Sequence, residues 1–324
     1  MSTKQTVKRS TPKSAEKAQP VFERVGFLGL GIMGSAMAGN LMKAGFEVHG
    51  FDPTPKARQH FKAAGGHVRS DPADLVRSVQ VIICSLPSAA ALMDTAGILA
   101  RVGRKGLLVI ETSTLDVKDK EAARNIMAKK GVVLLDCPLS GTGAQAARKD
   151  LTVYASGPKA DIRQLAPVFE GFSKAHFDLG AFGNGMKMKL MANLLVAIHN
   201  VSTAEALLLG ARWGISPSTA VKVLSDGAGG SRMLQVRGPM MEDEGWTEAT
   251  MKVAVWQKDM KLIAQALEEM QVPAPLFTAS IPVYNAAMGM GHENNDTAAV
   301  FDVLERMSSP VKKSVAKKQV SRKK

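Results

Sequence analysis

Lys189 and Asn193 are two polar residues whose types and spacing could support proton transfer. They lie four positions apart in a stretch that predicts a helix, so both side chains share one face of it. A lysine can accept the proton of a hydroxyl group when burial or a nearby cation lowers its pKa. Asn193 could bond the substrate oxygen or orient the ammonium group. A helical lysine is more often a surface charge, and Lys187, on the opposite side of the helix, fits that description better.

A glycine pattern near the start of the chain could bind phosphate groups. Residues 29–34 match G-x-G-x-x-G between a predicted strand and a predicted helix. There the first glycine permits a tight turn, the second lets backbone amides approach a pyrophosphate, and the third lets helix and strand pack closely. The helix N-terminus adds oriented amides. We predict dinucleotide contacts from Gly29, Leu30, Gly31, Ile32, Met33 and Gly34.

Asp52 ends a second predicted strand, 21 residues after Gly31. A carboxylate at this place would accept hydrogen bonds from the adenosine ribose hydroxyls and would repel a 2′-phosphate. The sequence therefore predicts NAD as the cofactor, with NADP less favoured. The simpler alternative is a glycine turn that binds no ligand, and the strand and helix on either side of the loop argue against it.

The elements that must position these residues are visible in the pattern from residue 24 onward. Short apolar runs alternate with longer amphipathic stretches, which is typical of a parallel sheet covered by helices on both faces. We expect strands at 24–29, 47–51, 79–86, 107–111, 132–136 and 151–156, with helices such as 33–44, 55–64, 116–130 and one near 161–169. Residues 21–182 are thus predicted to form an α/β domain with a doubly wound parallel sheet of the Rossmann type.

The pattern changes to all-α after residue 183. Residues 186–212 contain no proline and no glycine before Gly210, and their apolar side chains recur every three or four positions. This predicts a long interdomain helix. Further helices are expected around 217–225, 249–270, 275–289 and 296–307, with no strand. We predict an all-α domain for substrate binding and oligomerisation over residues 183–310.

Four motifs in order give the chain a resemblance to the β-hydroxyacid dehydrogenases, which include 3-hydroxyisobutyrate, L-threonate and 6-phosphogluconate dehydrogenases and tartronate semialdehyde reductase. Residues 29–41 resemble the family's opening signature, and residues 136–142, Asp-Cys-Pro-Leu-Ser-Gly-Thr, resemble its substrate-binding Asp-Ala-Pro-x-Ser-Gly-Gly. Residues 183–193 resemble its catalytic G-x-G-x-x-x-K-x-x-x-N, and Lys258-Asp259-Met260 resembles its Lys-Asp-Leu. The resemblance covers about residues 24–308.

The resemblance implies an NAD(P)-dependent dehydrogenase or reductase that acts on the CH-OH group of a small β-hydroxy acid and interconverts it with a semialdehyde or keto acid. It implies that Lys189 is the general acid/base and that Asn193 serves catalysis and substrate binding. Further substrate contacts are expected from Ser140, Gly141 and Thr142. Further cofactor contacts are expected from Leu86, Pro87, Thr114 and Lys258, with Thr114 and Lys258 near the nicotinamide. Thr142 departs from the family pattern, because it replaces the second glycine of Ser-Gly-Gly.

Composition sets the expectations for partners and location. The chain has 324 residues, of which 45% are hydrophobic and 22% charged, as in an ordinary soluble globular protein. Cys84 and Cys137 lie in apolar segments, which indicates that both are core residues and that the protein is found in a reducing compartment. The six histidines show no metal-binding spacing. No apolar run approaches the ~18 residues that span a bilayer, and no secretory h-region is present. We expect a cytoplasmic protein with no metal and no membrane contact; mitochondrial import is the lesser option.

The net charge of +13 lies mainly at the two ends. Residues 1–20 carry +4 and residues 311–324 carry +7, which leaves +2 for residues 21–310. Both ends are poor in large apolar residues and are predicted to be disordered basic tails. Nucleic-acid binding is therefore not expected beyond a weak, salt-sensitive attraction. The long helix has apolar residues around much of its circumference, which favours a homodimer or homotetramer.

Alternative functions remain both within this family and outside it. Within the family, residues 151–157 resemble the sugar-acid members somewhat more, which keeps a tartronate semialdehyde reductase or an L-threonate-type dehydrogenase beside a 3-hydroxyisobutyrate dehydrogenase. Outside it, a non-catalytic dinucleotide-binding scaffold with DNA-binding tails would suit the charge, and an imine reductase would share the fold. Relatives of both kinds lack or replace the catalytic lysine, so Lys189 argues against them.

Overall fold

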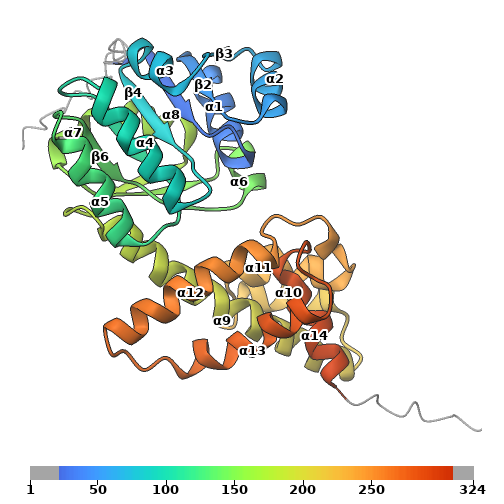
Figure 1. Ribbon diagram of the computed structural model, residues 1–324. Coiled ribbons are helices and arrows are strands. Elements are labelled where there is room, and N and C mark those ends of the chain that lie inside the picture. Colours follow the sequence, from blue (N-terminus) through green and yellow to red (C-terminus); the bar gives the residue numbers. More distant parts are fainter. Residues whose placement is uncertain (1–21, 309–324) are drawn as a thin grey trace, which may run out of the picture.

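A six-stranded parallel sheet forms the N-terminal half of the protein (Figure 1). The computed structural model describes residues 22–308, so the predicted tails at 1–20 and 311–324 lie outside the described residues. The strand order is β3-β2-β1-β4-β5-β6, which reverses direction between β1 and β4 and confirms the predicted doubly wound α/β class. The strands are β1 (Arg24–Leu28), β2 (Glu47–Phe51), β3 (His67–Val68), β4 (Val81–Cys84), β5 (Leu108–Glu111) and β6 (Val133–Asp136).

Helices cover both faces of this sheet because successive residues of each strand point to opposite sides. Ile83 of β4 packs in the core that includes Met37 of α1, whereas Ile82 packs in the core that includes Leu92 of α4. All four residues of β4 and of β5 are buried. The connecting helices are α1 (Ile32–Lys43), α2 (Pro55–Ala63), α3 (Pro72–Ser78), α4 (Ala89–Val102) and α5 (Val117–Ala128).

A separate three-stranded sheet follows, and it corrects one expectation. The predicted strand at 151–156 does not join the main sheet: β8 (Thr152–Ala155) pairs antiparallel with β7 (Leu139–Ser140) and parallel with β9 (Ala175–Asp178). Only two residues separate β6 from β7, too few for β7 to join the main sheet as a parallel strand, and β8 pairs with β7 instead. The single helix expected near 161–169 is split in two, and Pro167 lies in the first turn of the second. The helices here are α6 (Gly143–Ala147), α7 (Lys159–Gln164) and α8 (Ala166–Phe172).

The C-terminal half is helical, as predicted, and no strand occurs between residues 184 and 308. The sequence did not indicate α11, because Gly238 and Pro239 near its end disfavour a helix. Two short 3₁₀ turns, Gly245–Thr247 and Thr297–Ala299, join the longer elements. The helices are α9 (Asn184–Arg212), α10 (Pro217–Asp226), α11 (Arg232–Glu242), α12 (Val253–Glu269), α13 (Pro275–Gly289) and α14 (Val300–Met307).

Helix α9 runs from the three-stranded sheet into the helical region, where α10 to α14 pack around it (Figure 1). By length and composition alone it could cross a membrane, since its most apolar 18-residue window has a mean hydropathy of 1.5. Of its apolar side chains, Met191, Leu195 and Leu209 remain exposed. Packing buries part of this apolar surface, because Ala197, Ala204 and Leu207 lie in the same core as Trp256 and Tyr284. The helix therefore serves as the central support of the C-terminal half.

Candidate active site

The predicted glycine loop lies between β1 and α1, at the carboxyl edge of the main sheet. Gly29 has a φ of +95°, and a Cβ there would collide with the backbone oxygen of Ser85. A Cβ on Gly34 would collide with the backbone oxygen of Gly29, so helix and strand pack too closely for any side chain. A Cβ on Gly31 would meet no atom within 4 Å. The loop is thus closed towards the protein and open on the side of the α1 N-terminus, a shape that fits a pyrophosphate.

Asp52 is buried at the end of β2 and holds the glycine loop in place. Its Oδ2 accepts a hydrogen bond of 2.8 Å from the backbone N–H of Leu30, and its Oδ1 accepts one of 2.8 Å from that of Thr54. The Arg58 guanidinium donates to the backbone oxygen of Asp52 at 2.6 Å. The structure therefore adds a positioning role to Asp52, while its contact with a ribose stays a prediction.

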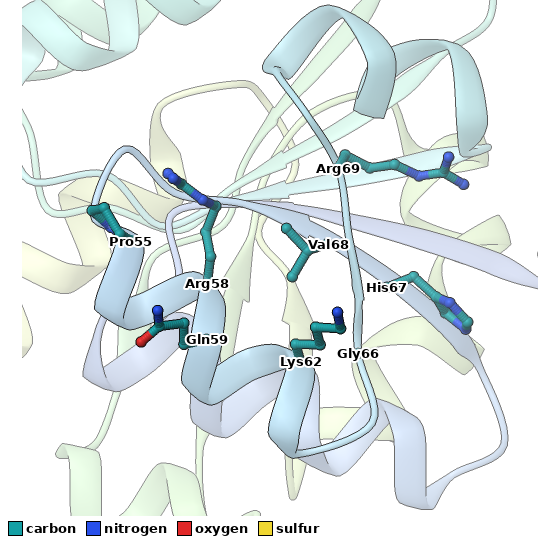
Figure 2. A pocket seen from close by; sticks show the side chains of 8 residues that line it. All are labelled: Pro55, Arg58, Gln59, Lys62, Gly66, His67, Val68 and Arg69. Carbon is teal, nitrogen blue, oxygen red and sulfur yellow. The ribbon is translucent and has the colours of Figure 1, made fainter.

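An open pocket of about 630 Å³ lies between α2 and β3 (Figure 2). Its cationic side chains do not converge: His67 and Arg69 point away from Arg58 and Lys62 in Figure 2. None of its lining residues belongs to the predicted site; they are Pro55, Arg58, Gln59, Lys62, Gly66, His67, Val68 and Arg69. We therefore assign no substrate to this pocket.

Three segments that are distant in sequence meet at the expected nicotinamide side of the site. The backbone N–H of Leu86, which precedes the exposed Pro87, donates to the hydroxyl of Ser113 at 2.8 Å. Lys258, on α12, donates from Nζ to the backbone oxygen of Thr114 at 2.8 Å. The residues predicted from the loops after β4 and β5 are thus joined to each other and to the helical half.

The predicted substrate segment lies against the glycine loop. Ser140 ends β7, and Gly141 follows with a φ of +134°, which favours glycine. Thr142 replaces the second glycine of the family's Ser-Gly-Gly. Its φ of −98° is ordinary, so the backbone at this position tolerates a side chain. Its hydroxyl accepts from the backbone N–H of Gln145 and caps α6. A Cβ on Gly143 would touch the Ile32 side chain, which shows how closely the two loops approach.

Lys189 and Asn193 are both buried on one face of α9, whereas Lys187 is exposed, as the helical spacing predicts. Asn193 donates from Nδ2 to Oδ2 of Asp259 on α12 at 2.9 Å. The Nζ of Lys258 lies 3.9 Å from the other oxygen of Asp259. Sequence reasoning did not identify the bond between Asp259 and Asn193, since nothing local to Asp259 indicates a partner 66 positions away.

The electrostatics of this cluster suit proton exchange. Burial lowers the pKa of Lys189, and the positive charge of Lys258 acts in the same direction, while the attraction of Asp259 opposes both. Burial also raises the pKa of Asp259, against the effects of Lys189, Lys258 and the bond from Asn193. Among the described residues, Oδ1 of Asp259 has no hydrogen-bond partner. The cluster therefore combines a lysine that gives up its proton more readily than a free one with a carboxylate oxygen that accepts no hydrogen bond.

Two family models match the chain, and together they span nearly all of the described residues. Residues 24–208 match the NAD binding domain of 6-phosphogluconate dehydrogenase. Residues 183–304 match the NAD-binding domain of NADP-dependent 3-hydroxyisobutyrate dehydrogenase. The two matches overlap over residues 183–208, which include most of α9, the helix that carries Lys189 and Asn193.

Individual proteins resemble the chain over almost their full length. L-threonate dehydrogenase of Cupriavidus necator is 31% identical over 293 residues, which are 89% of this chain and 98% of that protein. Mouse mitochondrial 3-hydroxyisobutyrate dehydrogenase is 31% identical over 86% of each chain. The structure of Mycobacterium tuberculosis 3-hydroxyisobutyrate dehydrogenase with L-serine has a TM-score of 0.79 and 27% identity, and covers 88% of this chain and 99% of that one.

Proposed function

The chain belongs to the β-hydroxyacid dehydrogenase family and is an NAD(P)-dependent oxidoreductase of the CH-OH group of hydroxy acids, and from this premise we propose that Lys189 is its general acid/base. The observation that carries the proposal is the burial of Lys189 beside the Asn193–Asp259 pair. Burial disfavours the ammonium form and lowers the pKa of Lys189, so this lysine gives up its proton more readily than a free lysine does.

In the oxidation direction, neutral Lys189 takes the proton of the substrate hydroxyl while the carbinol carbon loses a hydride, and a carbonyl forms. A nicotinamide cofactor bound there would supply the hydride acceptor, and the hydride donor for the reverse reaction. In reduction, protonated Lys189 returns its proton to the carbonyl oxygen. Asn193, held by Asp259, orients the substrate oxygen towards the lysine.

The dinucleotide is held by the glycine loop, residues Gly29 to Gly34, with its adenosine ribose at Asp52. The closed inner side and open outer side of that loop support this placement. Leu86, Pro87, Thr114 and Lys258 complete the nicotinamide side, in line with the bonds that join their segments. We propose NAD in preference to NADP, because the Asp52 carboxylate would repel a 2′-phosphate.

The substrate is a small hydroxy acid whose carboxylate binds at Ser140, Gly141 and Thr142. The approach of this segment to the glycine loop supports that role. A hydroxylated three- or four-carbon acid such as threonate or glycerate is favoured over 3-hydroxyisobutyrate, because residues 151–157 resemble the sugar-acid members of the family somewhat more.

We further propose a homodimer or homotetramer formed through the helical half. Large apolar side chains on and just after α9 are exposed in the single chain, and a second copy would cover them: Met191, Leu195, Leu209 and Trp213. Light scattering at micromolar concentration should give at least twice the mass of the chain. We propose a reducing, cytoplasmic location, because Cys84 and Cys137 are both free and buried.

A substrate panel tests the proposed function. NADH formation is followed with threonate, glycerate, 3-hydroxyisobutyrate and 3-hydroxypropionate under the same conditions. Turnover of at least one of them is expected, with the highest kcat/KM for threonate or glycerate. Cofactor binding without turnover of any acid would favour the non-catalytic scaffold instead.

A further inference from the structure

Lys120 lies fully buried on α5 between two buried carboxylates. Its Nζ is 2.6 Å from Oε2 of Glu111 and 2.7 Å from Oδ1 of Asp136. All three side chains have no exposed surface. Glu111 and Asp136 are the last residues of the neighbouring parallel strands β5 and β6 and are paired in register. One ammonium group thus joins the carboxyl ends of two strands at the edge of the sheet where ligands bind.

On one side, this cluster is bonded to the first turn of α9. The second oxygen of Asp136 accepts from the backbone N–H of Met186 at 2.8 Å and from the hydroxyl of Ser156 at 3.1 Å. That hydroxyl accepts from the backbone N–H of Gly185 at 2.9 Å. A carboxylate at a helix N-terminus is favoured by the helix dipole. Met186 lies one turn before Lys189 on the same buried face, so Asp136 fixes the start of the helix that carries the proposed acid/base.

On the other side, the cluster is bonded to the loops expected at the nicotinamide. Oε1 of Glu111 accepts from the backbone N–H of Ser113 at 2.9 Å, and the hydroxyl of Ser113 accepts from the backbone N–H of Leu86 at 2.8 Å. The next residue, Thr114, receives the bond from Lys258. A chain of hydrogen bonds, with the Lys120–Glu111 ion pair as one link, therefore runs from Leu86 through Lys120 to the first turn of α9.

We propose that Lys120 is a positioning residue of this active site, because its ammonium group fixes the nicotinamide-side loops and the first turn of α9 relative to each other. Its ion pairs and side-chain hydrogen bonds are with Glu111 and Asp136 and with none of the residues proposed to bind cofactor or substrate, so it acts through these two carboxylates. The inference rests on the proposed function for its effect on catalysis. Buried ion clusters are often no more stabilising than apolar packing, so stability alone does not explain this one.

The charge of Lys120 is central to this role. Burial disfavours the ammonium form, but the attractions of Glu111 and Asp136 outweigh burial and raise the pKa of Lys120. The lysine is therefore charged at any pH at which the enzyme works. Without it, two buried carboxylates would face each other uncompensated, and one strand end would have to move or take up a proton.

The test compares Lys120→Met and Asp136→Asn with the unchanged protein. Lys120→Met leaves two carboxylates unpaired and can fail to fold, whereas Asp136→Asn keeps the shape and removes one charge. Lys129→Met is the matched control, because Lys129 is an exposed lysine just after the same helix. The measurements are amide hydrogen exchange over residues 183–190, kcat, the isotope effect of a substrate deuterated at the carbinol carbon, and the dissociation constant of NADH.

In a folded variant we expect exchange over residues 183–190 to be at least about tenfold faster, while residues 200–210 are unchanged. Misplacement of the reacting groups should lower kcat by about 10–100-fold and increase the isotope effect, with NADH affinity within about threefold. Unchanged exchange over 183–190 together with unchanged kcat would overturn the proposal, even if thermal stability fell. If the unchanged protein turns over no acid of the panel, the proposed function fails and the exchange result alone decides the role of Lys120.

Discussion

Asn193 on α9 and Asp259 on α12 form a buried hydrogen bond of 2.9 Å between two helices that carry the proposed chemistry. An ionised carboxylate only accepts hydrogen bonds, so the amide must turn its Nδ2 towards Asp259. The orientation of Asn193 is thereby fixed, and so is the group that it offers to a substrate oxygen. Asp259 also lies close enough to Lys189 for its negative charge to raise the pKa of that lysine.

Replacement of Asp259 by Asn should lower kcat and move the pH profile. The variant loses the fixed amide orientation, so we expect kcat to fall by about 10–100-fold. The negative charge of Asp259 raises the pKa of Lys189, so its removal should shift the inflection of the oxidation rate to lower pH. Steady-state rates between pH 6 and 10 measure both effects. An inflection that moves to higher pH would contradict this account of the cluster.

Cofactor choice should depend on Asp52 and its neighbour Arg58. In the unchanged protein we expect kcat/KM for NAD to exceed that for NADP by at least about tenfold, a difference of about 1.4 kcal/mol. Asp52→Asn removes the repulsion of the 2′-phosphate and leaves Arg58 nearby as a cation, so the ratio should fall towards or below one. In the double variant with Arg58→Ala added, the increase in kcat/KM for NADP should be lost. Equal kcat/KM for both cofactors in the unchanged protein would refute the assignment.

Asp296 should dominate the stability of the helical half. Its fully buried carboxylate accepts from Arg237 at 2.9 Å and from Thr250 and the backbone N–H of Met251. Asp296→Ala leaves Arg237 buried and unpaired, so we expect a loss of about 3–5 kcal/mol in the free energy of unfolding, measured with urea. Asp243→Ala, at an exposed position after α11, should change it by no more than about 0.5 kcal/mol.

The contribution of Asp296 should also depend on pH. Burial disfavours its charge, but Arg237 and the hydrogen bonds outweigh burial and lower the pKa of Asp296 in the folded state. A carboxyl whose folded pKa is depressed stabilises the protein above its unfolded pKa and loses that effect as pH falls through the folded value. The stability difference between the unchanged protein and Asp296→Ala should therefore shrink below about pH 4. A difference that grows towards acid pH would be inconsistent with this ion pair.

Much of the fold could be predicted because it is encoded locally. The glycine loop needs only its own spacing and the strand and helix beside it, and Lys189 and Asn193 share a face by helix geometry alone. The main sheet follows from apolar runs that match strands buried on both faces. Helix α11 was missed, because Pro239 is a local signal against a helix. Strand β8 was predicted as a strand but placed in the wrong sheet.

The polar network could not be predicted because it depends on distant pairs. Lys120 lies in an amphipathic stretch of charged residues, and its sequence does not distinguish it from the exposed Lys118. Asp259 is paired with Asn193 across 66 positions. The available signal was that Glu111 and Asp136 each end an apolar strand, where buried carboxylates require a cation.

The most direct test of the account is the comparison of Lys189→Ala with Lys187→Ala in the oxidation direction. Lys189→Ala should lower kcat by about 10²–10⁴-fold, with little change in NAD affinity, because the glycine loop and Asp52 are untouched. Lys187→Ala changes an exposed lysine two positions away and should leave kcat nearly intact. The rate of the unchanged protein should rise with pH as Lys189 loses its proton, and this inflection should be absent from Lys189→Ala. A Lys189→Ala enzyme with unchanged kcat and an unchanged pH profile would contradict the central claim.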